Sequence, residues 1–243
     1  MLDKFVVTTK RFIERQREFS KINAHIPNFT WSYGPDAHEY SRIDVIRNQL
    51  SNKVSPEISW RPSLICNAIS HYKLIEKCAE GNKVMTIMED DAVLVTDFDS
   101  KATSLIDKLP NRNFDLIQWG WNWDSFVYVR NQNGESQKID WSSKYLKVQP
   151  QNFRDEETLS NLKPLLLSFG IHCYTITPQG AQKLLKLYPI IEDIFVDSVD
   201  ITGIAFPSET IDGAFNAFYP SMEAYVSIAP LSYAMNDKQN SLL

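Results

Sequence analysis

The sequence has no hydrophobic run long enough to cross a membrane, and its basic residues form no cluster. A membrane span needs roughly 18 apolar residues, and the apolar stretch within residues 1–10 is also too short for a signal peptide. The 25 Lys and Arg residues against 30 Asp and Glu residues give a net charge of −5, which does not favour binding to a phosphate backbone. We therefore expect a cytoplasmic protein with no nucleic-acid partner, which contacts a membrane at most peripherally, at its cytoplasmic face.

Cysteine and the common nucleotide-binding motifs are also scarce or missing. Cys66, Cys78 and Cys173 are an odd number at spacings that match no metal-binding pair, so we predict reduced, buried thiols. No Gly-x-Gly-x-x-Gly or P-loop segment is present, which disfavours NAD and ATP sites of those types. No serine has the glycine pattern of a nucleophile elbow, which disfavours a Ser-His-Asp hydrolase.

Short apolar strands alternate with helical patterns along the 243 residues. We expect strands at residues 4–9, 29–33, 83–88, 114–119, 171–176 and 224–228. We expect helices after the first strand and at residues 60–80, 100–109, 178–187 and 211–218. A hairpin signal at Asn133 and Gly134 predicts a small β-insertion over residues 127–148. The alternation predicts an α/β fold with a doubly wound, mostly parallel sheet flanked by helices.

The strongest chemical signal is the run Glu89-Asp90-Asp91, which directly follows a strand that is apolar along its length. Ligands of parallel α/β sheets bind beyond the carboxyl ends of the strands. Two like charges about 4 Å apart cost on the order of 4 kcal/mol at an effective dielectric constant of about 20. A divalent cation would compensate for this repulsion and bridge the carboxylates to nucleotide phosphates. The alternative is a solvated acidic turn that caps the next segment.

A tryptophan cluster follows the strand at residues 114–119. Trp119, Trp121 and Trp123 are interleaved with glycine, amide and carboxylate residues, the last of which is Asp124. Indole faces beside polar groups suit a sugar, so Trp121, Trp123 and Asp124 are our candidates for acceptor binding. Core packing explains one or two of the tryptophans equally well.

Hydroxyl and cationic side chains follow the first strand, and two histidines have polar neighbours. The residues beyond the first strand are Thr8, Thr9, Lys10, Arg11 and Arg15. They are placed to receive a nucleotide, although a solvated helix face is an equal alternative. His71, beside Ser70 in the longest predicted helix, fits a hydrogen-bonded structural histidine better than a ligand. His172 begins a strand, where it can reach a metal, a phosphate or only a backbone carbonyl.

Taken in order, several segments resemble glycosyltransferase family 25, the lipooligosaccharide-type and collagen-type β-galactosyltransferases. The match begins with Lys10-Arg11 and Arg15, and continues through Cys66-Asn67-Ala68-Ile69-Ser70-His71-Tyr72, where Ile65 replaces the usual glycine. It then includes Met88-Glu89-Asp90-Asp91, Gly170-Ile171-His172-Cys173-Tyr174 with Gly180-Ala181 and Leu184-Leu185, Thr210-Ile211-Asp212, and Ala229-Pro230. The resemblance spans residues 5–237.

This resemblance implies a single GT-A-like domain over residues 1–243, with a nucleotide-sugar half at about 1–123 and an acceptor half at about 124–243. The implied reaction is inverting transfer of a hexose, most often galactose from UDP-galactose, to a glycan hydroxyl in lipopolysaccharide or other surface-glycan synthesis. The implied cofactor is Mn²⁺ or Mg²⁺, held by Glu89 and Asp91. The implied donor-binding residues are Thr8, Thr9, Lys10, Arg11, Arg15, Ser70, His71, Asp90 and His172.

Inversion by single displacement needs a general base within about 3 Å of the acceptor hydroxyl. Asp212 matches the late aspartate of the family and is our candidate, with a helix cap as its alternative role and Glu209 as the reserve base. Two other functions stay open on the residues themselves. One is a non-catalytic carbohydrate-binding module, and the other is a metal-dependent hydrolase of phosphoesters or UDP-sugars.

Overall fold

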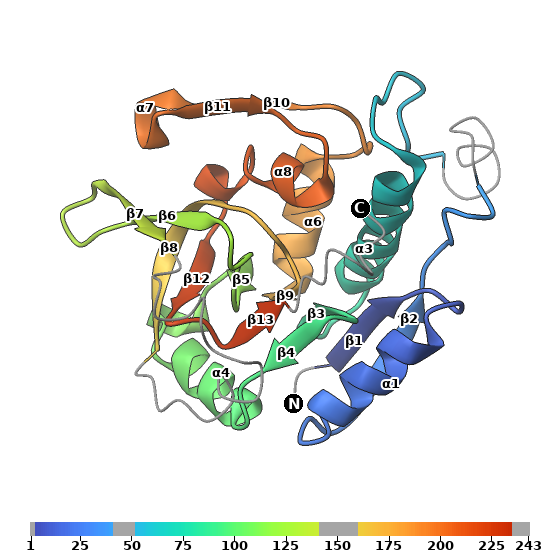
Figure 1. Cartoon of the computed structure of the whole chain (residues 1–243). Helices are drawn as coiled ribbons and strands as arrows, with labels where there is room; N and C mark the ends of the chain where they lie inside the picture. Colours follow the sequence, from blue (N-terminus) through green and yellow to red (C-terminus); the bar gives the residue numbers. More distant parts are fainter. Residues whose placement is uncertain (1–2, 41–51, 141–159, 235–243) are drawn as a thin grey trace.

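A computed structural model describes residues 3–40, 52–140 and 160–234 (Figure 1). The protein is an α/β fold built on a nine-stranded sheet in the order β2-β1-β3-β9-β5-β12-β8-β6-β7. These strands are β1 (Asp3–Thr8), β2 (Phe29–Tyr33), β3 (Met85–Glu89), β5 (Leu116–Gln118), β6 (Phe126–Arg130), β7 (Ser136–Asp140), β8 (Asn161–Ser168), β9 (Cys173–Ile176) and β12 (Ala224–Ile228). Two small strand pairs lie outside this sheet, β4 (Ala92–Leu94) with β13 (Ser232–Ala234) and β10 (Phe195–Ser198) with β11 (Ile204–Pro207).

Most strands of the large sheet point the same way, as the sequence predicts. β1 pairs in parallel with β2 and β3, and β5 pairs in parallel with β12. β9 is antiparallel to both of its neighbours, β3 and β5, and β8 is antiparallel to β12 and β6. β7 is antiparallel to β6. Because β9 runs backwards, its first residues lie at the same sheet edge as the last residues of β1, β3 and β5.

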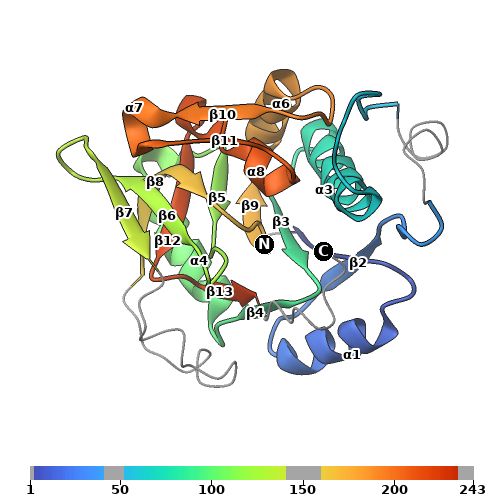
Figure 2. The ribbon, with the colours of Figure 1, turned by 45° about the horizontal axis from the view of Figure 1, so that its top comes forward.

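Helices cover both faces of the sheet, which confirms the doubly wound arrangement. α1 (Ile13–Ile22) and α4 (Phe98–Asp107) lie on one side, whereas α3 (Pro62–Glu80) and α6 (Pro178–Leu187) lie on the other (Figures 1 and 2). α3 lies within the predicted range of residues 60–80; it begins at Pro62 and ends before Gly81. α1 packs on the sheet through Phe19, whose ring lies 5.3 Å from that of Phe29 and 5.6 Å from that of Trp31.

The remaining elements are short. They are the helices α7 (Val199–Thr202) and α8 (Ile211–Phe215) and the 3₁₀ turns at Pro110–Arg112 and Tyr219–Ser221. The β6–β7 hairpin turns at the predicted Asn133 and Gly134, with Gly134 at φ 85°. Residues 141–148 of the predicted insertion lie outside the described residues. β4, β8, β10, β11 and β13 were not predicted from the sequence.

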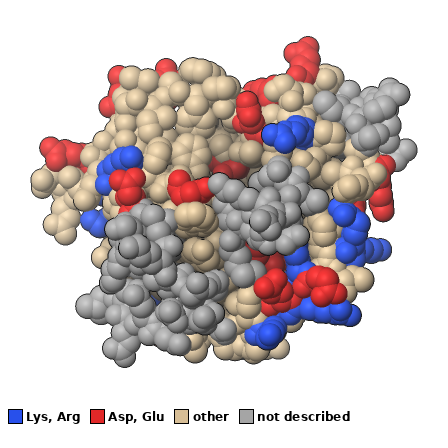
Figure 3. All heavy atoms as spheres, in the orientation of Figure 1, with Lys and Arg blue, Asp and Glu red and all other residues tan. Residues whose placement is uncertain are grey.

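The two predicted halves of the chain share one sheet. β9 comes from the second half and lies between β3 and β5 of the first. All three cysteines are free and buried, as predicted. No helix within the described ranges is long and apolar enough to cross a membrane. On the face shown in Figure 3, basic and acidic side chains are interspersed over α1 at lower right.

Candidate functional site

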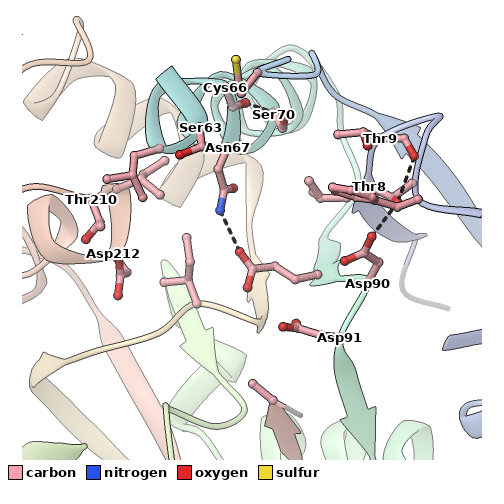
Figure 4. A pocket seen from close by; sticks show the side chains of 18 of the residues that line it. Thr8, Thr9, Ser63, Cys66, Asn67, Ser70, Asp90, Asp91, Thr210 and Asp212 are labelled. Carbon is pink, nitrogen blue, oxygen red and sulfur yellow. Dashed lines mark hydrogen bonds between the residues drawn. The ribbon is translucent and has the colours of Figure 1, made fainter. Parts of the chain in front are cut away.

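A pocket lies at the sheet edge where β1 and β3 end. In the register of these parallel strands Val7 is opposite Glu89, so Thr8 and Asp90 follow side by side. The pocket is lined by residues from several separate parts of the chain, namely Val7, Thr8, Thr9, Phe12 and Arg15; Pro35 and Ala37; Ser63, Leu64, Cys66, Asn67 and Ser70; Glu89, Asp90 and Asp91; Asn122; Gly170 and Ile171; Thr210, Ile211 and Asp212; and Ala234 (Figure 4). The acidic run therefore meets a pocket, as the sequence predicts.

Both oxygens of Asp90 are held by neighbouring side chains. The Thr8 hydroxyl donates to Oδ2 at 2.6 Å, and the Arg15 guanidinium lies 2.5 Å from Oδ1. Figure 4 shows the Asp90 carboxylate turned toward Thr8. Burial raises the pKa of Asp90, although Arg15 and Thr8 oppose that rise. Asp90 therefore anchors Arg15 at the pocket wall and has no oxygen left without a protein contact.

Asp91 is placed differently. Its Oδ2 lies 3.4 Å from Arg15, whereas its Oδ1 is buried without a hydrogen-bond partner. Burial and the nearby charge of Glu89 raise the pKa of Asp91 to about 7. A buried acceptor without a donor is destabilising, so this oxygen is suited to binding a ligand.

Two side chains of α3 bind the Glu89 carboxylate. Its Oε1 accepts hydrogen bonds from Nδ2 of Asn67 and from Nε2 of His71, each at 3.2 Å. Burial would raise the pKa of Glu89, but the hydrogen bond and charge of His71 outweigh it and lower that pKa to about 2. Glu89 is therefore ionised at neutral pH, and it is one of four carboxylates that line the pocket.

The pocket is strongly acidic. Glu89, Asp90, Asp91 and Asp212 line it, and Arg15 is its only basic residue among the described ones. No group of three or more His, Cys, Asp or Glu side chains in the described part of the chain is arranged as a metal site. Three lining residues nevertheless carry an oxygen that is buried without a partner among the described residues, namely Oδ1 of Asp91, Oδ1 of Asn67 and Oγ1 of Thr9. Hard oxygen donors of this kind suit Mg²⁺ and Mn²⁺ when water and phosphate complete the coordination.

Asp212 lies on the opposite side of the pocket from Asp90 and Asp91 (Figure 4). It stands in the first turn of α8, where Thr210 rather than Asp212 caps the helix by accepting a hydrogen bond from the Gly213 amide. The Gly170 amide donates to Oδ2 of Asp212 at 2.7 Å. The alternative role of Asp212 as a helix cap is therefore wrong, and within the described part of the chain Oδ1 of this pocket residue makes no hydrogen bond.

Half of the predicted site residues line the pocket and half do not. Those in the lining are Thr8, Thr9, Arg15, Ser70, Glu89, Asp90, Asp91 and Asp212. Those outside the lining are Lys10, Arg11, His71, His172, Trp121, Trp123, Asp124 and Glu209. Lys10, Asp124 and Glu209 are exposed, and Arg11 pairs with Asp36 at 2.6 Å on the surface. His71 is buried and lies within hydrogen-bond distance of Glu89 and Tyr174, and it does not line the pocket.

The predicted tryptophan platform does not fit this structure. Trp119 and Trp121 are 0% and 2% exposed and belong to the hydrophobic core, so neither has an open indole face for a sugar. Trp123 is partly buried against the same core. His172 is buried as well, with Nε2 3.0 Å from the Ser232 hydroxyl, and burial lowers its pKa to about 4. Trp121 and His172 are therefore buried side chains that do not line the pocket.

Sequence reasoning missed two amides of the pocket, Asn67 and Asn122. Asn67 stands on the same face of α3 as Ser63 and Ser70, at helical spacing, so the polar edge of the predicted helix carried the signal. Asn122 lies in the loop after β5, and its side chain packs against Gly170. No local pattern in the sequence distinguishes Asn122 from an ordinary loop residue.

The model of glycosyltransferase family 25, described as an LPS biosynthesis protein, matches residues 2–199. A comparison with curated proteins found no match. Among solved structures, the inositol-1-phosphate CTP transferase from T. maritima is similar, with a TM-score of 0.46 and 11% sequence identity, over 99% of this chain and 91% of that chain.

Proposed function

This chain belongs to glycosyltransferase family 25, and on that premise we propose that it transfers a hexose from a UDP-sugar to a glycan hydroxyl with inversion. Galactose is the hexose we propose first, with an acceptor in lipopolysaccharide or another surface glycan. The observation that carries the proposal is a pair of carboxylate oxygens at the end of β3 in an acidic pocket, Oε2 of Glu89 and Oδ1 of Asp91, which make no hydrogen bond to any described residue.

The charges of the pocket require a cation if a diphosphate is to bind. Four carboxylates and one guanidinium line it, so a diphosphate would meet a net negative surface. Glu89 and Asp91 would hold Mn²⁺ or Mg²⁺, which supplies Lewis-acid stabilisation of the departing UDP. Arg15 is held at the wall by Asp90 and adds one fixed positive charge. The Thr9 hydroxyl, which has no partner among the described residues, would be available to the donor. The hydroxyls of Thr8 and Ser70 donate to Asp90 and to the Cys66 carbonyl, so they would only accept hydrogen bonds, as from a ribose hydroxyl.

Asp212 is the base that we propose. Its Oδ2 is occupied by the Gly170 amide, which fixes the carboxylate and leaves Oδ1 to accept the proton of an acceptor hydroxyl. The attack then comes from the side of the pocket opposite Asp90 and Asp91, as inversion at the sugar carbon requires. Lys10, Arg11 and Glu209 lie outside the lining, so we assign them no role in this mechanism.

The test is release of UDP from UDP-galactose and UDP-glucose with Mn²⁺, with and without EDTA. The double variant Glu89→Ala, Asp91→Ala should lose turnover. The matched control, Glu14→Ala with Glu18→Ala, removes two exposed carboxylates from α1 and should keep it. Undiminished turnover in the pocket variant would refute the site assignment.

Two outcomes of the same assay would favour the other functions left open by the sequence. Rapid hydrolysis of the UDP-sugar that no glycan alters would indicate a hydrolase. Glycan binding with no measurable affinity for UDP would indicate a carbohydrate-binding module.

A further inference from the structure

A buried chain of hydrogen bonds runs from Glu89 into the protein. His71 is 0% exposed and does not line the pocket. Its Nε2 lies 3.2 Å from Oε1 of Glu89, and its Nδ1 lies 3.1 Å from the hydroxyl of Tyr174. The His71 and Tyr174 rings are also stacked, with centroids 5.8 Å apart and planes 23° from parallel. The imidazole is therefore fixed on both nitrogens and on one face.

The direction of these bonds follows from the charge of Glu89. An ionised carboxylate only accepts hydrogen bonds, so Nε2 of His71 must carry the hydrogen that is shared with Oε1. Tyr174 then completes the arrangement by pairing with Nδ1. Histidines that orient a charged site commonly have their second nitrogen fixed in this way.

Both donors from α3 meet the same oxygen of Glu89. Asn67 and His71 are four residues apart, so their side chains project from the same helix face, and both donate to Oε1. Figure 4 draws the bond from Asn67 as a dashed line. Within the described ranges Oε2 makes no hydrogen bond, although Glu89 lines the pocket. The carboxylate is therefore divided into one oxygen bound by the protein and one oxygen left for a ligand.

We infer that His71 is a positioning residue, which acts with Asn67 and Tyr174 to hold Glu89 so that Oε2 alone meets a divalent cation. The inference deepens the proposed function and rests on it for the identity of the cation. It replaces the direct contact with the donor that the family resemblance implied for His71. Without His71, the Glu89 side chain is free to rotate and to turn Oε1 toward the pocket or toward Asn67 alone.

Two amide substitutions separate this role from packing. His71→Gln places an amide donor near the position of Nε2 and keeps the bond to Glu89. His71→Asn has the same chemistry on a shorter side chain, which reaches the position of Nδ1 but not Glu89. We expect Mn²⁺ affinity, measured by calorimetry or electron paramagnetic resonance, to fall roughly 10- to 100-fold in His71→Asn. In His71→Gln it should stay within about threefold of the wild type, since the donor to Oε1 is kept.

Thermal unfolding of each variant shows whether it is folded. Tyr174→Phe provides a second test, because it keeps the stacked ring and removes only the hydroxyl. We expect Tyr174→Phe to weaken Mn²⁺ binding less than His71→Asn does. Equal Mn²⁺ affinity in the wild type and His71→Asn would overturn the inference. Equal losses in the folded Asn and Gln variants, or no Mn²⁺ binding by the wild type with or without UDP, would overturn it as well.

Failure of the proposed function looks different in the same experiments. If Mn²⁺ binding depends on His71 as expected but no UDP-sugar is turned over with any acceptor, the positioning role stands and the transfer reaction falls. If the wild type turns over UDP-sugar and His71→Asn does so at the same rate, the transfer reaction stands and the positioning role falls.

Discussion

Replacing Gly170 with alanine should test how closely the residues around Asp212, the proposed base, are packed. Gly170 has φ 93°, and a Cβ there would lie 2.6 Å from Cγ of Asn122, 3.0 Å from its backbone nitrogen and closer still to its Oδ1. The same residue donates its amide to Asp212. The substitution therefore strains the backbone, displaces Asn122 and disturbs the proposed base at once.

Two other glycines allow these costs to be separated. Gly134 and Gly203 have φ 85° and 75°, and a Cβ at either position would meet nothing within 4 Å. Alanine at these positions should cost only the left-handed backbone strain, roughly 1–2 kcal/mol. At Gly170 the overlap with Asn122 adds about 1–3 kcal/mol. Since 1 kcal/mol shifts Tm by about 2–4 °C in a protein of this size, Gly170→Ala should melt roughly 2–12 °C below the two controls.

The measurement is thermal unfolding of the three alanine variants, with UDP release measured on the same samples. Gly170→Ala should also slow turnover, because Asp212 loses its fixed donor, whereas the two control glycines lie outside the pocket lining. Combining Gly170→Ala with Asn122→Ala should recover part of the lost stability, since the overlapping side chain is gone. If the Tm of Gly170→Ala equals those of Gly134→Ala and Gly203→Ala, the inferred close packing at the pocket is refuted.

Three further substitutions test the chemistry of the site. Asp212→Asn should lower kcat by about 10²- to 10⁴-fold in the UDP-release assay, whereas a comparable loss in Glu209→Gln alone would move the base to Glu209. Burial lowers the pKa of His172 to about 4, so as pH falls from about 6.5 the unfolded chain is protonated at this residue before the folded protein is. Between pH 7 and pH 5 the free energy of unfolding, measured with urea, should therefore fall by about 2 kcal/mol more in the wild type than in His172→Gln. An equal fall in the two proteins would contradict this. The pKa of Asp91 is raised to about 7, so the contribution of Asp91 to stability is lost as pH rises from about 4 to 7. At pH 8 Asp91→Asn should therefore be more stable than the wild type by on the order of 2–4 kcal/mol, and it should bind Mn²⁺ more weakly. A less stable variant would refute the raised pKa.

The sequence predicts the elements of the fold better than their pairing. Apolar runs identify β1 and β3, and the periodicity of residues 60–80 identifies α3, because burial leaves a local pattern in both cases. β8 was missed because Pro164 interrupts it, and proline is uncommon inside a strand. The antiparallel insertion of β9 between β3 and β5 was also not foreseen. A run of apolar residues reports that a strand is buried, but its direction and neighbours depend on contacts distant in the chain.

The site follows the same division between local and distant information. The position of Glu89-Asp90-Asp91 at the end of β3 was predictable, since a strand end is a local feature. The separate roles of the three acids were not, because they are set by side chains from other elements, by Thr8 and Arg15 at Asp90 and by α3 at Glu89. The tryptophans show the opposite case. Their spacing suggested an exposed platform, but the sheet and α4 cover Trp119, whose ring packs 5.6 Å from that of Phe98.

The distribution of partners among the three acids explains how a pocket this acidic is tolerated. Asp90 is neutralised by Arg15 and hydrogen-bonded by Thr8, and Glu89 is stabilised by His71 and Asn67 through one oxygen. Asp91 receives the least compensation, so burial and the charge of Glu89 act mainly on it and raise its pKa. The electrostatic cost of the run is thereby concentrated on a single carboxylate at the pocket. A cation that contacts Asp91 and the remaining oxygen of Glu89, as we propose, would relieve that cost, so the arrangement that destabilises the protein by itself would favour binding of the cation.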